Sequence, residues 1–171
     1  FEAPIYQQAG IPVTYVGHPL ADVLPLEPDR AATRELLNVP SSAPVFALLP
    51  GSRQGELRLL ADTFIETARR LHEKLPNSRF LVPLATRETR LMFEEALYRC
   101  QAGDLPITLL FGHAHEAMIA ADGVLVASGT ATLEAALLKR PMVIAYRLAP
   151  MSYFLMKRMA YLPYVGLPNV L

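Results

Sequence analysis

The feature that most limits the fold of this chain is a regular alternation of apolar runs and helical patterns that begins near residue 45. Apolar runs of strand length occur at residues 45–49, 79–84, 106–110, 123–127 and 142–146. The stretches between them predict helices, at residues 57–75, 86–100, 115–121 and 130–139. Strands that alternate with helices form a parallel sheet, and continuous apolar runs are typical of strands buried on both faces. The pattern therefore predicts an α/β fold with a doubly wound parallel sheet.

The first 44 residues follow a different pattern, because prolines interrupt them repeatedly between Pro19 and Pro44. We expect a strand at residues 11–16. We also expect a helix at residues 29–37 with Asp29 as its N-cap, since an aspartate there accepts hydrogen bonds from unpaired N–H groups. Residues 1–44 are thus predicted to be a connection with edge elements, and residues 45–171 to be the domain that carries the site.

Composition narrows the class of protein. The chain has 171 residues, 52% of them hydrophobic, which is enough for a real core. No apolar run approaches the roughly 18 to 20 residues that cross a bilayer, and the first residues lack the pattern of a signal peptide. The sequence starts at Phe1 rather than Met, so we expect a piece of a longer chain. A single cysteine, Cys100, makes no internal disulfide and fits a reducing cytosol.

Charge is balanced overall but uneven along the chain. The 16 basic and 16 acidic residues give a net charge of zero, which is not the composition of a nucleic-acid binder. No acidic residue follows Glu134, whereas this last part contains Lys139, Arg140, Arg147, Lys157 and Arg158. A basic and apolar C-terminal third is suited to phosphates or to an anionic membrane surface.

The strongest local motif is Ala-Ser-Gly-Thr-Ala-Thr-Leu-Glu at residues 127–134, where a predicted strand ends and a helix begins. The unpaired N–H groups of a helix N-terminus favour a phosphate, Gly129 allows close approach, and Ser128 and Thr130 add hydroxyls. Glu134 lies one turn further on the same face, where its carboxylate can hold a ribose diol. The alternative is a helix capped by Ser128 or Thr130 with an incidental Glu134. A capping box would place its acid three residues after the cap, so it does not explain Glu134.

A second motif, Gly-Ser-Arg-Gln-Gly-Glu at residues 51–56, also lies between a strand and a helix. Gly51 and Ser52 make a flexible turn, and the planar guanidinium of Arg53 suits a phosphate or diphosphate. The pattern is neither a Walker loop nor GxGxxG, and an ordinary turn with a solvated Arg53 is the alternative. Both motifs follow strands, so we expect them at the same edge of the sheet, where open α/β folds bind ligands.

Histidines and the cysteine suggest no further catalytic centre. His113, His115 and Glu116 invite a metal interpretation, but no other ligand lies near in the sequence, so no metal is expected and a loop beside a nucleotide base is the alternative. His72 is expected to be solvated, and Cys100, which has no CxxC partner, to be inert. Position 126 is Val rather than Gly, so the sequence has no G-x-S-x-G elbow of a serine hydrolase.

Residues 149–164 combine aromatic side chains and methionines with the pair Lys157-Arg158. A helix of this composition can lie at a membrane interface with its cations towards the headgroups. A helix packed in the core, with two cations that reach out to solvent, is the alternative.

Taken together and in this order, several motifs resemble the lipid-A-disaccharide synthases of Gram-negative bacteria. These are Gly17-His18-Pro19-Leu20, the Leu-Leu-Pro-Gly-Ser-Arg of residues 48–53, the motif at 127–134, Tyr146-Arg147 and Leu167-Pro168-Asn169. The resemblance covers essentially the whole chain. It implies an inverting glycosyltransferase with two Rossmann-like halves, the GT-B architecture. That family joins UDP-2,3-diacylglucosamine to 2,3-diacylglucosamine 1-phosphate and releases UDP at the cytoplasmic face of the inner membrane.

Position by position, the resemblance implies that this chain is the C-terminal, UDP-sugar-binding half. The residues that it places in the donor site are Gly51, Ser52, Arg53, Ser128, Gly129, Thr130, Glu134 and Asn169. Arg53 would oppose the charge of the departing diphosphate, and Glu134 would bind the ribose. The N-terminal half with the acceptor surface and the general base, and the helices after Leu171, would be absent, so this fragment alone would be inactive.

The resemblance also implies the partners. They are the UDP-diacylglucosamine donor, the diacylglucosamine 1-phosphate acceptor and the inner-membrane surface, with no metal, cofactor or nucleic acid. A homodimer is left open. Residues 1–44 would then be an inter-domain connection. Two other functions remain alternatives at this point: another UDP-sugar enzyme of the same architecture, such as a UDP-N-acetylglucosamine epimerase or a different hexosaminyltransferase, and a non-catalytic nucleotide-binding or structural α/β module.

Overall fold

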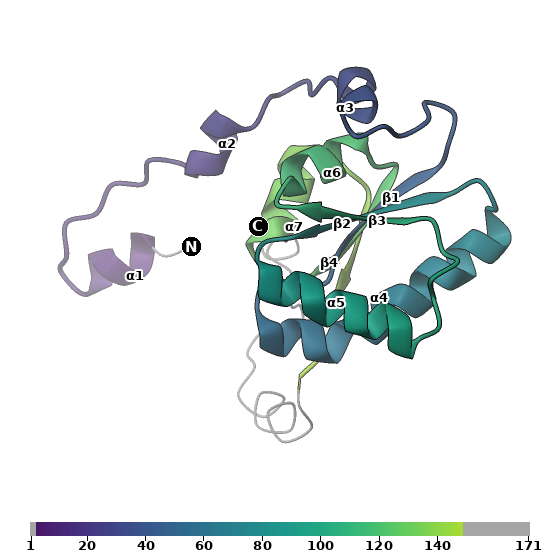
Figure 1. The fold of residues 1–171 in the computed structure, drawn as a ribbon. Coiled ribbons are helices and arrows are strands. Elements are labelled where there is room, and N and C mark those ends of the chain that lie inside the picture. The colour runs from purple at the N-terminus through teal and green to yellow at the C-terminus, as the bar shows by residue number, and fades with distance from the viewer. Residues whose placement is uncertain (1–2, 149–171) are drawn as a thin grey trace.

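A computed structural model describes residues 3–148, which form a parallel β-sheet with helices on both faces (Figure 1). The strands are β1 Val45–Leu49, β2 Arg79–Leu84, β3 Ile107–Phe111, β4 Gly123–Ala127 and β5 Met142–Ala145. The helices are α1 Ala3–Gln8, α2 Pro19–Val23, α3 Arg30–Leu36, α4 Gln54–Lys74, α5 Arg87–Arg99, α6 Ala114–Ala120 and α7 Thr130–Leu137. None of these helices is long and apolar enough to span a membrane.

The strands lie in the order β3-β2-β1-β4-β5, and every neighbouring pair is parallel. This is the order of a doubly wound sheet, in which the chain runs outward from β1 in one direction and then returns to the other side of β1. The direction changes between β1 and β4, where Leu49 is paired with Val126. The α/β, doubly wound fold predicted from the sequence is confirmed.

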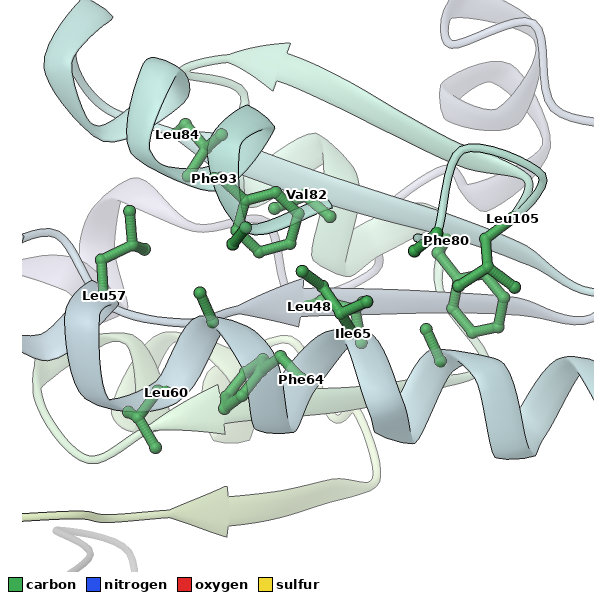
Figure 2. Packing of buried hydrophobic residues seen from close by; sticks show 14 of the residues in the cluster. Leu48, Leu57, Leu60, Phe64, Ile65, Phe80, Val82, Leu84, Phe93 and Leu105 are labelled. Carbon is green, nitrogen blue, oxygen red and sulfur yellow. The ribbon is translucent and has the colours of Figure 1, made fainter. Parts of the chain in front are cut away.

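Helices α4 and α5 cover one face of the sheet, and their apolar sides form a core with β1 and β2 (Figure 2). Phe64 of α4, Phe80 of β2 and Phe93 of α5 are completely buried there. The second face is covered by α6 and α7, with Met118 and Ala135 among its buried side chains. Successive residues of β1 point to alternate faces, so this central strand contributes to both cores, as its continuous apolar sequence predicts.

Helix α5 begins with a side-chain cap, and helix α7 ends before the residue expected from the sequence. Thr86 caps α5, since its hydroxyl accepts from the Thr89 N–H at 3.2 Å, and the Thr89 hydroxyl accepts from the Thr86 N–H at 3.1 Å. The helix predicted at 130–139 ends earlier, at Leu137, and the last strand ends at Ala145. His72, expected to be solvated, is instead half-buried, with its Nδ1 3.2 Å from the hydroxyl of the buried Ser78.

The first residues contain two short helices, and the stretch between them, where a strand was expected, is irregular. The strand predicted at residues 11–16 is wrong, because nothing pairs with this stretch and its apolar side chains Tyr15 and Val16 are exposed. A strand without a neighbour leaves its backbone groups unpaired. Helices α1 and α2, which were not predicted, lie away from the sheet on an extended stretch of chain (Figure 1). The Asp29 N-cap of α3 is confirmed, since its carboxylate accepts from the Ala32 N–H at 2.9 Å.

Candidate functional site

A cavity of about 350 Å³ opens at the carboxyl ends of the strands, between the loops that follow β1 and β4. It lies where the strand order changes direction, the usual ligand position in open α/β sheets. Its size is within the usual range of small-molecule sites. The lining residues are Leu49, Gly51, Ser52, Arg53, Glu56, Pro83, Leu84, Ala85, Gly112, Ala114, Ala127, Ser128, Gly129, Thr130, Ala131 and Glu134.

The loop after β1 turns sharply into α4. Gly51 has a φ of 118°, a backbone conformation that glycine adopts at little cost. The Glu56 carboxylate reaches back from the first turn of α4, and its Oε2 accepts from the N–H groups of Ser52 and Arg53 at 3.1 and 3.3 Å. The Arg53 guanidinium is 3.4 Å from Oε1 of the same carboxylate, and the Arg53 side chain is 84% exposed. This loop therefore already holds one anionic group, supplied by the chain itself.

Glu56 also lines the cavity with a charged side chain, and no role was predicted for it. The signal for it was present, because a glutamate three residues after an N-cap can bond back to the cap N–H. Arg53 is that N-cap residue. A capping box has two hydrogen bonds, and the arginine side chain cannot accept the one from the helix N–H group. Only the bond from the Arg53 N–H to the Glu56 carboxylate is therefore formed.

The loop after β4 places a glycine at the start of α7. Gly129 is the N-cap residue and has no side chain to accept from the first N–H groups of the helix. A glycine cap leaves the start of a helix without an acceptor from the cap side chain, and the positive end of the helix dipole favours an anion there. The alternative in which Ser128 or Thr130 is the helix N-cap is therefore wrong. The Thr132 hydroxyl donates to the Gly129 carbonyl at 2.7 Å and fixes the turn from within the helix.

Glu134 lies on α7 one turn after Thr130, and both residues line the cavity. Its side chain is 18% exposed, so the carboxylate is partly shielded from solvent but accessible from the cavity. Oε2 of Glu134 lies 3.4 Å from Nε2 of His115, which belongs to α6. The cavity therefore offers a ligand two features close together: a carboxylate that accepts hydrogen bonds and a helix N-terminus that favours an anion.

The structure brings most of the predicted site residues together. Gly51, Ser52, Arg53, Ser128, Gly129, Thr130 and Glu134 all line the one cavity. Asn169 lies outside the described residues, as does the stretch 149–164. The roles given to these residues in donor binding stay predictions.

The histidines and the cysteine of residues 3–148 lie outside the set of residues that line the cavity. No group of three or more His, Cys, Asp or Glu side chains in this described part of the chain is placed to hold a metal ion. His113 lies 3.5 Å from Glu116 of the same loop and helix. Burial raises the pKa of the Cys100 thiol, which disfavours its reactive thiolate form.

Two solved structures share this fold. The E. coli ADP-heptose LPS heptosyltransferase II matches 67% of this chain and 36% of its own with a TM-score of 0.53 and 18% identity. The S. aureus MnaA structure with UDP matches 84% of this chain and 38% of its own with a TM-score of 0.51 and 11% identity. These two likenesses agree with the Rossmann-like, doubly wound α/β fold that the sequence predicts.

The chain belongs to the lipid-A-disaccharide synthetase family, whose model matches residues 1–171. The lipid-A-disaccharide synthase of Aromatoleum aromaticum is 69% identical over 171 residues, which cover 100% of this chain and 44% of that protein. The synthase of Dechloromonas aromatica is 66% identical, with coverage of 99% and 45%. The chain thus spans less than half the length of these relatives. The family resemblance seen in the sequence is confirmed.

Proposed function

We propose that this chain forms the UDP-sugar-binding part of a lipid-A-disaccharide synthase. The whole enzyme would join UDP-2,3-diacylglucosamine to 2,3-diacylglucosamine 1-phosphate and release UDP. The observation that carries the proposal is the convergence of the two glycine loops and Glu134 on one cavity at the change of strand direction. Family membership supports the choice of reaction.

In this proposal the two loops hold the diphosphate of the donor. The N–H groups of Ser52 and Arg53 bind the Glu56 carboxylate, so their orientation suits an anion, and the diphosphate would replace this carboxylate on them. The N-terminus of α7, with Gly129 as its cap, offers a second set of N–H groups across the cavity. Glu134 would bind the ribose hydroxyls, and Asn169 would complete the site.

The chemical role of this chain is to stabilise the leaving group. When the acceptor hydroxyl attacks the anomeric carbon, negative charge develops on the departing UDP. Arg53 and the helix N–H groups oppose that charge most strongly in the transition state, which lowers the barrier. The general base and the acceptor surface would come from another part of the enzyme, the N-terminal half of a GT-B architecture.

The remaining partners follow from the lipid nature of the substrates. Both carry acyl chains, so the enzyme would work at the inner face of the inner membrane as a peripheral protein. Arg147, which is exposed after β5, comes from the part of the chain without acidic residues, and the basic composition of that part suits an anionic surface.

The test is a transfer assay on the protein produced at the full length of its gene. Labelled UDP-2,3-diacylglucosamine and 2,3-diacylglucosamine 1-phosphate should give the disaccharide and an equal amount of UDP. A sugar that stays on UDP but changes its configuration would instead support an epimerase. Binding of UDP without turnover of either kind would support a nucleotide-binding module.

Thermal unfolding with nucleotides tests the diphosphate assignment separately. A ligand that binds the native state raises the melting temperature by mass action, so UDP should protect the protein. UMP should protect it less, because it lacks the β-phosphate that the two loops would hold. Equal shifts from UMP and UDP would contradict this assignment.

A further inference from the structure

The carboxylate of Glu134 lies beside a histidine of the neighbouring helix α6. Nε2 of His115 lies 3.4 Å from its Oε2, although the two residues belong to different crossovers of the sheet. Glu134 lines the cavity, whereas His115 is not among the lining residues. The imidazole therefore contacts the carboxylate without occupying the ligand space.

The helix that carries His115 is held firmly. Immediately after His115 and Glu116, the residues Ala117, Met118, Ile119 and Ala120 are all buried against the sheet. The helix begins at a sharp turn, since Gly112 and His113 both have positive φ. The buried residues that follow His115 and the turn that precedes it together limit where the His115 ring can lie.

We propose that His115 is a positioning residue, which holds the Glu134 carboxylate in the orientation that binds the ribose hydroxyls of the donor nucleotide. This inference rests on the proposed function. A carboxylate offers about four lone-pair directions on its two oxygens. In this proposal the ring nitrogen, 3.4 Å from Oε2, takes one of these directions, and Oε1 is left for the ligand. An acid held in this way loses less rotamer entropy when the ribose binds, and site residues supported by a second layer of contacts are more effective.

The neighbouring histidine provides a matched control. His113 lies 3.5 Å from Glu116, which is on its own loop and helix, and neither residue lines the cavity. Its φ of 55° is left-handed, a conformation that asparagine tolerates well. His113→Asn therefore removes an imidazole from the same loop while it preserves the backbone and the His115–Glu134 contact.

The experiment measures affinities for UDP and for 2′-deoxy-UDP and 3′-deoxy-UDP by calorimetry on the full-length protein. His115→Ala should weaken UDP binding by about threefold to fivefold, which is within the usual worth of one hydrogen bond. For the deoxy nucleotide that lacks the hydroxyl bound by Glu134, the same variant should reduce the affinity much less. His115→Gln, which keeps an N–H donor, should restore most of the affinity, and His113→Asn should bind like the wild type.

A double-mutant cycle shows whether His115 acts through Glu134. Glu134→Gln should weaken UDP binding by about tenfold or more, because bonds from a charged group are lost. If the imidazole works only through this carboxylate, adding His115→Ala to Glu134→Gln should cause no further loss. Equal losses for UDP and both deoxy nucleotides in His115→Ala, or fully additive losses in the double variant, would overturn the inference.

The two hypotheses fail in different ways. A wild-type protein that does not bind UDP contradicts the proposed function itself. A wild-type protein that binds UDP, with weaker binding in Glu134→Gln but unchanged binding in His115→Ala, contradicts only the role of His115. Melting temperatures of the unliganded variants are measured alongside, and they should stay close to that of the wild type because the His115 side chain is 39% exposed.

Discussion

Arg34 of α3 donates through Nη2 to Oδ2 of Asp122, the residue before β4, at 2.9 Å. The same guanidinium donates to the carbonyls of Ala120 at 2.9 Å, Ser41 at 2.7 Å and Ala43 at 3.2 Å. Asp122 accepts in turn from the Val45 N–H at 2.8 Å and pairs with Arg30. One ion pair therefore joins α3, the end of α6 and the amino ends of β1 and β4.

The first prediction concerns the pH dependence of stability at Asp122. Burial raises its pKa, but the Val45 N–H, Arg30 and Arg34 together outweigh burial and lower it below the usual value. A carboxyl whose pKa is lowered by folding stabilises the protein above its unfolded pKa of about 3.9, and this stabilisation is lost as the pH falls through the folded pKa. Asp122→Asn should therefore cost about 1 kcal/mol at neutral pH, since partial exposure weakens the pairs.

Urea unfolding between about pH 3 and pH 7 measures this effect. The free energies of unfolding of the wild type and of Asp122→Asn should converge as the pH falls below about 4. Parallel curves over the whole range would show that the carboxylate charge does not stabilise the fold.

The second prediction compares the two arginines that face Asp122. Arg34→Lys should lower the free energy of unfolding by about 2 to 3 kcal/mol, because an ammonium cannot reach three carbonyls and a carboxylate in the way the planar fork does. Arg30→Lys is the matched control. The Arg30 side chain is 36% exposed, so its replacement should cost less than about 1 kcal/mol. Equal losses in the two variants would contradict the anchoring role of Arg34.

The sequence predicted the bounds of the three inner strands well because β1, β2 and β4 are largely buried on both faces. Val45–Leu49, Arg79–Leu84 and Gly123–Ala127 were expected with these bounds and are observed with them. A strand of this kind must be apolar throughout, so its limits can be read from composition alone. The stretch at 11–16 is also apolar in part, but apolarity does not supply a neighbour for pairing, and no strand forms there.

The site was predicted where it depends on local sequence and missed where it depends on contacts between distant segments. The loops at Gly51 and Gly129 follow directly from the position of glycine between a strand and a helix. The contact of His115 with Glu134 arises only when α6 and α7 pack on the same face of the sheet. The Arg34–Asp122 pair similarly joins segments 88 residues apart, and no pattern along the chain indicates it.

The third prediction concerns the two glycines of the loop after β1. A Cβ on Gly51 would lie 2.6 Å from Cβ of Glu56, and the φ of 118° strains any L side chain. Gly51→Ala should therefore lower the free energy of unfolding by about 1 to 3 kcal/mol and disturb the N–H groups of Ser52 and Arg53 that bind Glu56. UDP affinity should fall with it.

Gly55→Ala is the control for this prediction. Gly55 lies inside α4, and nothing lies within 4 Å of an added Cβ. This variant should raise the free energy of unfolding by about 0.4 to 1 kcal/mol, because alanine restricts the unfolded chain and favours the helix. A loss in both variants would mean that the loop tolerates no side chain for reasons other than its backbone conformation.

The last prediction concerns Arg53, whose side chain is 84% exposed at the edge of the cavity. If it opposes the charge of departing UDP, Arg53→Ala in the full-length enzyme should lower turnover by roughly 10² to 10³-fold, as loss of a comparable transition-state donor does. Arg53→Lys should recover only part of the rate, because lysine keeps the charge and loses the fork. The melting temperature should change little in either variant, since so exposed a side chain contributes little to packing. Steady-state kinetics measures the turnover. Arg70→Ala is the control, because Arg70 is an exposed arginine of α4 that pairs with Glu66. Wild-type turnover in a folded Arg53→Ala would remove Arg53 from the site.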